Sequence, residues 1–217
     1  QARAERGVVG GNSRGAAYWK PYPLTIERAS GTSLFDVDGN EYIDIINNHT
    51  SLAHSHRYPP IIESVSKQLA KGTAWSANNT LQMELSEMLI ERIPFMDSIR
   101  FTNSGSEGGI VALTIARAVT GRSKVLMAKH GYHGILPEYE AGTYPGLIPQ
   151  CEGSTYTGMF NDPTSFEQIL AEHGDEIAAV VLEPVMGAGG VVSATPEFLH
   201  RVKAAANAAG ALFVLDE

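Results

Sequence analysis

The chain has 217 residues, of which 43% are hydrophobic and 18% are charged, so it can bury a sizeable core and is not a disordered polypeptide. Its formal net charge is −8, and the sequence carries no basic patch or stripe of the kind that marks a nucleic-acid-binding protein. No apolar run approaches the roughly 18 residues that span a bilayer, and a single cysteine excludes an internal disulfide framework, so we expect a cytoplasmic protein with neither nucleic acid nor a membrane as a partner.

The first 60 residues are rich in glycine, asparagine, proline and aromatic residues. Within them the segment SLFDVDGNEYIDI, residues 33–45, alternates apolar and polar positions on both sides of the turn dipeptide Asp38-Gly39. This pattern predicts a β-hairpin. Pro59 and Pro60 then mark a boundary, and a helical pattern covers residues 61–70.

Helices and strands alternate from about residue 80 onward. The spacing of apolar residues predicts helices at residues 81–93, 105–120, 163–173 and 196–209. Short apolar runs predict strands at residues 98–102, 124–129, 177–185 and 211–216. Such alternation favours an α/β fold in which helices cover a parallel sheet. The ligands of these sheets bind beyond the carboxyl ends of the strands.

Asn103, Ser104, Gly105 and Ser106 lie between a predicted strand and a predicted helix. Ser104 and Glu107 have the spacing of a helix capping box. The free amides of a helix's first turn, with small and hydroxyl-bearing residues around them, can instead hold a phosphate. The segment matches neither a Walker loop nor a dinucleotide fingerprint. The local sequence therefore leaves open both an ordinary capped helix start and an anion site.

Aromatic and acidic side chains follow three other predicted strands. Tyr132 and His133, in the segment KHGYHG, could form a flat wall for a ring-shaped ligand, although such loop residues are more often half-exposed packing. Glu183 and Asp216 each follow a buried strand, where a carboxylate must be paired or must face a polar cleft. An aspartate there could hold a protonated ring nitrogen. The alternative is a carboxylate that caps the next helix.

Two further segments invite a ligand-binding interpretation. His49, His54 and His56 fit no standard zinc spacing and are accompanied by no cysteine pair, so we predict no metal site. The glycine-rich segment MGAGGVV, residues 186–192, lacks a following basic residue, and we interpret it as a tight turn close to the strand ends.

Seven motifs follow one another along nearly the whole chain: GGNSR, LFDVDGNEYIDI, HSHRYP, TNSGSEG, GYHG, LEPVMGAGGVV and LFVLDE. In this order they resemble the class III aminotransferases, which are pyridoxal-phosphate enzymes of fold type I. Within this family the chain resembles β-amino-acid aminotransferases and glutamate-1-semialdehyde aminomutases. The resemblance implies an α/β protein whose large domain has a mixed, mostly parallel sheet. Residues 61–217 would be the first part of this cofactor-binding domain, and residues 1–60 the N-terminal segment of a small domain.

The resemblance also implies which residues hold pyridoxal 5'-phosphate. Ser104, Gly105 and Ser106 resemble the turn that binds the phosphate of this cofactor. Tyr132 resembles the ring that stacks on its pyridine, with His133 beside it.

Three more residues match the family pattern. Asp216 resembles the residue that keeps the pyridine nitrogen protonated, so that the ring acts as an electron sink. Glu183 resembles an acidic residue that supports this region and belongs to the cofactor site. Arg14, in GGNSR, matches a position that binds a substrate carboxylate, for which an arginine fork is suited. Trp75 is a candidate wall of the substrate pocket, although a large aromatic residue is more often part of a core.

The sequence departs from the family pattern in two places. Gly108 and Gly109 follow Glu107, where the family has small residues other than glycine. The lysine that forms the Schiff base lies well beyond the LDE strand in this family. Because the chain stops in what reads as a buried strand, we expect it to be the first part of a longer polypeptide.

The activity implied by the resemblance is amino-group transfer, in a homodimer, between a carboxylate-bearing amino donor and a keto acid or aldehyde. Two alternatives remain open. One is a glutamate-1-semialdehyde 2,1-aminomutase, which returns the amine to another carbon of the same molecule. The other is a non-catalytic cofactor-binding or interaction fragment, if the polypeptide truly ends at Glu217.

Overall fold

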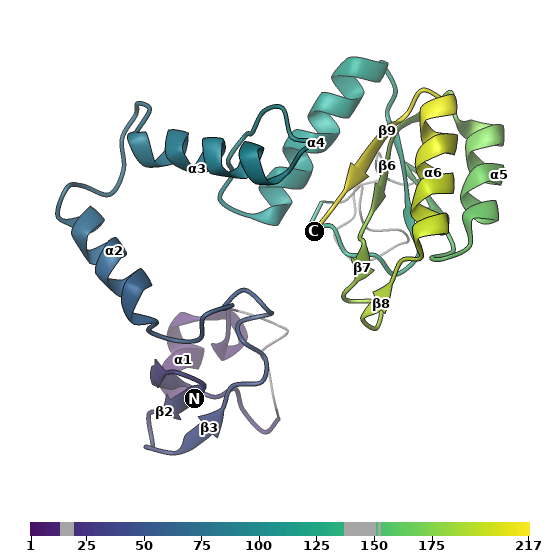
Figure 1. The fold of residues 1–217 in the computed structure, drawn as a ribbon. Coiled ribbons are helices and arrows are strands. Elements are labelled where there is room, and N and C mark those ends of the chain that lie inside the picture. Colours follow the sequence, from purple (N-terminus) through teal and green to yellow (C-terminus); the bar gives the residue numbers. More distant parts are fainter. Residues whose placement is uncertain (14–19, 137–150, 152) are drawn as a thin grey trace. The chain divides into compact units, whose positions relative to one another are not determined.

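The computed structural model describes residues 1–13, 20–136, 151 and 153–217. They fall into two compact units, residues 1–88 and 89–217 (Figure 1). The predicted domain boundary at residue 60 lies within the first unit and stays a prediction about the intact protein. Within the described part of the chain, no helix is both long and apolar enough to cross a membrane.

The first unit begins with a short helix and a small antiparallel sheet. Strand β2 is paired on one side with β1 and on the other with β3. In the β2–β3 pair, Leu34 lies opposite Tyr42, which confirms the hairpin predicted around Asp38-Gly39. Gly39 has a φ of 85°, a value that suits glycine in a tight turn. The elements are α1 (Ala2–Gly7), the 3-10 turn Val9–Gly11, β1 (Ile26–Ser30), β2 (Ser33–Asp36) and β3 (Glu41–Ile43).

Asp36 organises this hairpin through a buried carboxylate. Its oxygens accept hydrogen bonds from the backbone amides of Asp38 (3.0 Å) and Asn40 (2.8 Å), the Asn40 side chain (2.9 Å) and the Tyr42 hydroxyl (2.8 Å). The bond from the Asn40 side chain holds the pKa of Asp36 below its ordinary value, and the other bonds act in the same direction, whereas burial opposes them. The ionised carboxylate therefore stabilises the turn.

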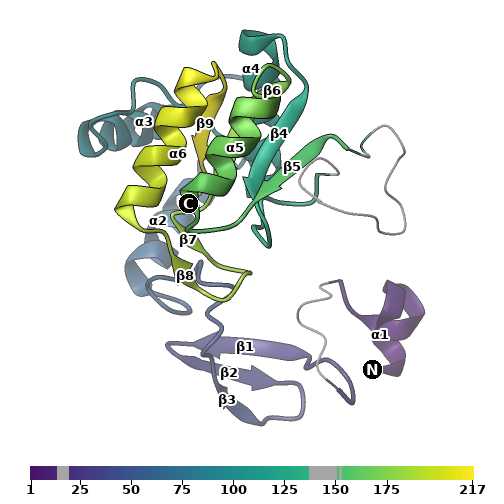
Figure 2. The same cartoon turned by 90° about the vertical axis from the view of Figure 1, so that its right-hand side faces the viewer.

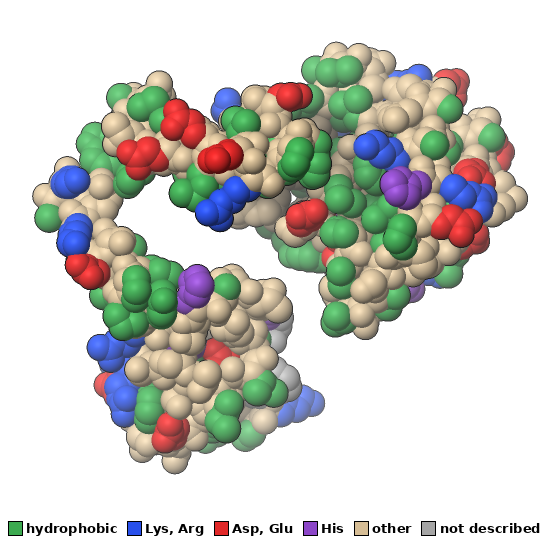
Figure 3. Space-filling model, in the orientation of Figure 1, with side chains coloured by type: hydrophobic (Ala, Val, Ile, Leu, Met, Phe, Trp, Pro, Cys, Tyr) green, Lys and Arg blue, Asp and Glu red, His purple; other side chains and the backbone are tan. Residues whose placement is uncertain are grey.

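Two helices follow, α2 (Pro59–Leu69) and α3 (Thr80–Arg92), where helices were predicted. The two prolines occupy the first positions of α2, where the backbone needs no amide hydrogen. Neither helix contains a buried residue. Figure 3 shows hydrophobic side chains on the surface of this part of the chain, and those of α2 include Ile61, Ile62, Val65 and Leu69. Helix α2 thus presents an apolar face that remains exposed.

The second unit is built on a four-stranded sheet in the order β5-β4-β6-β9. Each neighbouring pair of strands is parallel, as the mostly parallel prediction requires. All residues of β6 are buried, which is typical of a strand covered on both faces. The strands are β4 (Lys124–Ala128), β5 (Thr155–Gly158), β6 (Ile177–Leu182) and β9 (Leu212–Leu215).

Helices cover both faces of this sheet (Figure 2). Helices α5 (Pro163–His173) and α6 (Pro196–Ala208) pack one face, in a core that includes Phe166 and Phe198. Helix α4 (Gly105–Thr120) packs the other face through Leu113 and Ala116. All three confirm predicted helices.

The helix ends explain why these segments fold where they do. Asp162 accepts a hydrogen bond from the Thr164 amide at the start of α5, and Thr195 accepts one from the Phe198 amide at the start of α6. At the other end of both helices, the Arg122 guanidinium donates to the carbonyl oxygens of Gly174 (2.9 Å) and Ala209 (2.7 Å). It also donates to the carbonyl oxygen of Ile177 at the start of β6 (3.2 Å).

The structure also differs from the prediction in two strands. Residues 98–102 form no strand, so this prediction was wrong: a strand needs a neighbour to bond with, and none is paired with this segment among the described residues. Strand β5 was missed because its short sequence TYTG carries a weak apolar signal. The glycine-rich segment does form a turn, between β7 (Val185–Met186) and β8 (Val192–Ser193).

Candidate functional site

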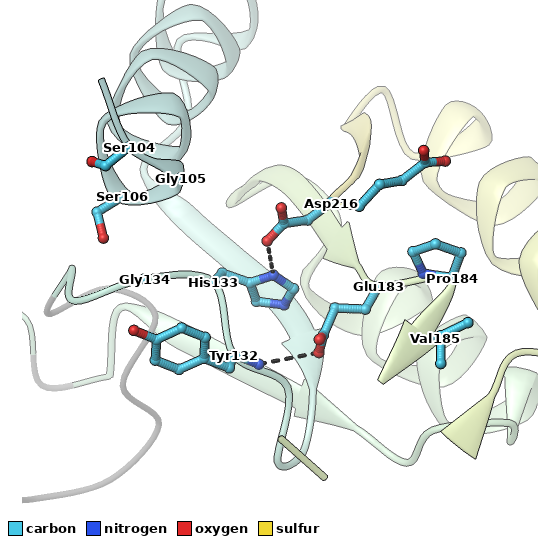
Figure 4. Close-up of a pocket in the computed structure, with 11 residues that line it drawn as sticks. Ser104, Gly105, Ser106, Tyr132, His133, Gly134, Glu183, Pro184, Val185 and Asp216 are labelled. Carbon is cyan, nitrogen blue, oxygen red and sulfur yellow. Dashed lines mark hydrogen bonds and ion pairs between the residues drawn. The ribbon is translucent and has the colours of Figure 1, made fainter. Parts of the chain in front are cut away.

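A cavity of about 720 Å³ lies in the second unit, where the carboxyl ends of the parallel strands meet the start of α4. This is the edge at which ligands of α/β sheets bind. Figure 4 shows the side chains around it. The predicted residues that line this one cavity are Ser104, Gly105, Ser106, Tyr132, His133, Glu183 and Asp216.

The start of α4 combines both interpretations of its sequence. The Ser104 hydroxyl accepts a hydrogen bond from the Glu107 amide (3.2 Å), and the Glu107 carboxylate accepts one from the Asn103 amide (2.7 Å). These contacts form a capping arrangement. The amides of Gly105 and Ser106 belong to the first turn, which has no intrahelical acceptors, and both residues border the cavity. A capped helix start therefore still presents an anion-binding edge.

Gly134 brings the loop after β4 against this helix start. Its φ is 97°, and a Cβ atom placed on it would lie 2.6 Å from the Ser106 Oγ and 2.9 Å from the Ser106 Cα. The next residue, Ile135, donates its backbone amide to the Ser106 Oγ (3.3 Å). Only glycine allows this close approach. Gly134 was not predicted as a site residue, although the second glycine of GYHG was the available signal.

Asp216 follows β9 and is bonded to its neighbours through both backbone and side chain. Its amide donates to the Leu182 carbonyl (2.8 Å), which continues the β6–β9 ladder. Its carboxylate lies 2.9 Å from Nδ1 of His133, as Figure 4 shows. An ionised carboxylate only accepts, so Nδ1 of His133 carries the hydrogen of this bond. The Asp216 side chain is 43% exposed, whereas that of His133 is 1% exposed. A ligand can thus reach the aspartate, and the histidine supports it from behind.

Tyr132 precedes this buried histidine and is itself 56% exposed. Its ring lies at the rim of the cavity (Figure 4). Glu183, directly after β6, accepts a hydrogen bond from the Tyr132 backbone amide through Oε2 (3.1 Å). It accepts another from the Gly187 amide through Oε1 (3.0 Å). The carboxylate therefore joins the loop after β4 to the glycine-rich turn.

The remaining candidates are not among the residues that line this cavity in the described part of the chain. Arg14 is outside the described residues. Trp75 lines a different cavity, of about 600 Å³, within the first unit. His56 lies 2.7 Å from Asp44, and the His54 ring stacks on Tyr58. Both histidines thus contact other side chains of the first unit, and the expectation of no metal site stays a prediction.

The architecture and the cavity can be compared with known proteins. A family model described as aminotransferase class-III matches residues 15–217. The chain belongs to the class-III aminotransferases. Its fold is that of the fold type I pyridoxal-phosphate transaminases.

Two known proteins resemble the chain over 90% or more of its length. It is 36% identical over 212 residues to a β-phenylalanine transaminase of Variovorax paradoxus, covering 98% of this chain and 48% of that protein. It is also 36% identical over 206 residues to a glutamate-1-semialdehyde 2,1-aminomutase of Rhodopirellula baltica, covering 90% of this chain and 47% of that protein.

A solved transaminase with bound PLP superimposes with a TM-score of 0.94 at 32% identity, over 99% of this chain and 53% of that one. This class-III aminotransferase chain therefore spans about half the length of the relatives that it matches.

Proposed function

We propose that the intact protein is a cytoplasmic, homodimeric aminotransferase that uses pyridoxal 5'-phosphate to move an amino group from a carboxylate-bearing donor to a keto acid or aldehyde. The observation that carries this proposal is one cavity bordered by a helix start, an exposed tyrosine and a reachable aspartate. Membership of the class-III family and the PLP bound to a similar transaminase support the same cofactor.

The residues of the cavity fit the parts of this cofactor. The α4 start, with Ser104, Gly105 and Ser106, suits a phosphate, because first-turn amides and hydroxyls donate to anionic oxygens. Gly134 opens the space beside Ser106 that a Cβ atom would fill. Tyr132 provides an aromatic surface for a ring, and Asp216 provides a carboxylate for a protonated ring nitrogen.

When bound, pyridoxal phosphate supplies an electron sink that eases the loss of a proton next to the substrate's amino group. In this proposal Ser104, Gly105 and Ser106 hold the phosphate and fix the position of the ring. Asp216 keeps the ring nitrogen protonated, and His133 orients the aspartate through its Nδ1 hydrogen bond. Tyr132 covers the ring and excludes water from one face.

Two parts of the proposed machinery are not among the described residues that line the cavity. Arg14, which we propose binds the substrate carboxylate, is assigned from the sequence motif alone. The lysine that moves the proton lies, in this proposal, outside residues 1–217. Glutamate-1-semialdehyde mutase activity is the second candidate, because an aminomutase is as similar to the chain as the β-phenylalanine transaminase is.

The experiment that tests this function uses the full-length protein. PLP binding is followed by the absorbance of the bound cofactor, and turnover is followed by mass spectrometry of both products with a panel of α- and β-amino donors and keto acids. Asp216→Asn is expected to lower turnover by at least about a hundredfold, the scale on which loss of one preorganised polar group is felt, and to retain some cofactor.

Asp162→Asn, a change at the cap of α5, is the control and should keep wild-type turnover. Wild-type turnover in Asp216→Asn would refute the assignment of the ring-nitrogen partner. Isomerisation of a single semialdehyde without a second substrate would favour the mutase. Absence of PLP binding by the wild-type protein would refute the proposed function.

A further inference from the structure

Glu183 has both carboxylate oxygens bonded to the backbone. The Tyr132 amide donates to Oε2 at 3.1 Å, and the Gly187 amide donates to Oε1 at 3.0 Å. The two donors belong to different segments, the loop after β4 and the turn between β7 and β8. Figure 4 shows the carboxylate directed toward the backbone nitrogen of Tyr132.

Gly131 shows how closely the loop packs on this carboxylate. A Cβ atom at Gly131 would lie 3.5 Å from Oε2 of Glu183, 3.1 Å from Nε2 of His133 and 3.2 Å from the Ala128 carbonyl oxygen. Contacts below 3.4 Å would force the neighbouring atoms to move, so an added side chain would disturb the loop where it meets both side chains. The absence of a side chain at this position therefore matches the close approach of the loop to Glu183.

The location of Tyr132 depends on this backbone contact. Tyr132 is 56% exposed, so the surrounding protein contributes little packing to hold the ring. A hydrogen bond from a backbone amide to a charged acceptor is among the stronger ones in proteins. The hydrogen bond from the Tyr132 amide can thus fix the backbone from which the exposed side chain extends.

We propose that Glu183 is a positioning residue, which sets the place of Tyr132 relative to the glycine-rich turn and does not itself bind the cofactor. The inference rests on the proposed function, in which the Tyr132 ring covers the pyridine. It revises the sequence-based expectation that Glu183 is part of the cofactor-binding set. Glu183 acts through Tyr132, whereas Asp216 acts through its own carboxylate.

Hydrogen exchange in the full-length protein without cofactor tests the tether directly. Glu183→Gln keeps the shape of the side chain but replaces one acceptor oxygen by an NH₂ group, which cannot accept from an amide. We expect exchange to accelerate about tenfold or more at Tyr132, at Gly187 or at both, since a bond to a charged group is lost. Glu172→Gln, an exposed glutamate at the end of α5, is the matched control and should leave both segments unchanged.

A second arm measures PLP itself. Glu183→Gln is expected to weaken PLP binding and to reduce the circular dichroism of the bound cofactor, because the covering ring is no longer fixed. Glu183→Asp keeps the charge but is one methylene shorter, so it should protect only one of the two amides and give an intermediate dichroism. If Glu183→Gln does not fold, Glu183→Asp is compared with the wild-type protein in its place.

Unchanged exchange at both amides, together with weakened PLP binding in Glu183→Gln, would overturn the proposal, because it would indicate direct contact with the cofactor. Unchanged exchange with unchanged PLP binding would overturn it as well. Failure of the wild-type protein to bind PLP would refute the proposed function alone, because exchange without cofactor still decides whether Glu183 holds the two segments.

Discussion

Single glycines shape the candidate site as much as its polar side chains do. Gly134 has a φ of 97° and lies against Ser106 more closely than any residue with a Cβ atom could. Gly131 packs in the same way beside Glu183 and His133. At the residue scale, the geometry of the cavity therefore depends on positions that carry no chemistry of their own.

Gly134→Ala should disturb the α4 start and weaken PLP binding. The new methyl group would lie 2.6 Å from the Ser106 Oγ, and the alanine would have to adopt a φ of 97°, which is unfavourable for a residue with a Cβ atom. Overpacking of this kind costs about 1–3 kcal/mol. Gly39→Ala is the control for backbone strain alone, because Gly39 has a φ of 85° with no atom near the added methyl group. The role given to Gly134 would be contradicted if both variants lost the same free energy of unfolding in urea and Gly134→Ala kept the wild-type PLP affinity.

Asp36 gives the first unit a predictable response to acid. Its pKa is held below the ordinary value, chiefly by the Asn40 side chain, so its contribution to stability is complete above the unfolded-state pKa of about 3.9 and is lost as the pH falls through the folded-state pKa. Asp36→Asn should thus destabilise the hairpin at neutral pH, and the difference from wild type should shrink as the pH falls below about 4.

The measurement for Asp36 is urea unfolding of the full-length protein at several pH values between 3 and 7. Asp38→Asn changes an exposed aspartate two residues away and serves as the control. A stability difference for Asp36→Asn that is the same at every pH would show that the carboxylate's charge does not act as described.

At the scale of elements, helices and strands were predicted best where local sequence signals and burial in the fold agreed. Helices α5 and α6 begin at Asp162-Pro163 and Thr195-Pro196, whose caps are local and easily recognised. Residues 98–102 resembled a strand, but a strand depends on a neighbour that local sequence does not reveal.

The candidate site was predicted in a similar way. Predicted strand ends identified Ser104, Tyr132, Glu183 and Asp216, and these residues do line one cavity, although the strand predicted before Ser104 does not form among the described residues. The partners within the site could not be predicted. The pairing of His133 with Asp216 and the tether from Glu183 to Tyr132 join residues far apart in sequence, and only the three-dimensional arrangement specifies such contacts.

Arg122 is the residue on which the α5 and α6 ends depend. Replacing it by methionine removes the donor shared by the Gly174, Ile177 and Ala209 carbonyls, so we expect a loss of about 2–3 kcal/mol in the free energy of unfolding. Lys203→Met, on the exposed side of α6, should change stability by less than about 0.5 kcal/mol. Denaturant unfolding of the two full-length variants measures both changes in the free energy of unfolding. Equal changes for Arg122→Met and Lys203→Met would refute the role of Arg122 at the two helix ends.

For the molecule as a whole, the proposed cofactor should act as a stabilising ligand. A ligand that binds only the folded state adds about 2.7 kcal/mol at a hundred times its dissociation constant. Pyridoxal, which lacks the phosphate, should raise the melting temperature of the full-length protein less than PLP does at equal concentration, because it leaves the α4 start unused. Ser106→Ala should narrow this difference. Equal stabilisation by both compounds would contradict a phosphate site at Ser104, Gly105 and Ser106.

The strand order has a consequence for synthesis on the ribosome. Strand β9, which carries Asp216 to the cavity, adds beside β6, and the α4 start, Tyr132, His133 and Glu183 are all translated before it. The nascent chain thus holds a phosphate cradle and an aromatic cover before it has the carboxylate for the ring nitrogen. During that interval β6, whose residues are all buried in the finished fold, has an unpaired edge that can bond to other chains. Cofactor binding is therefore expected late in translation. Before that point, the unpaired edge of β6 is the surface that a chaperone would need to cover.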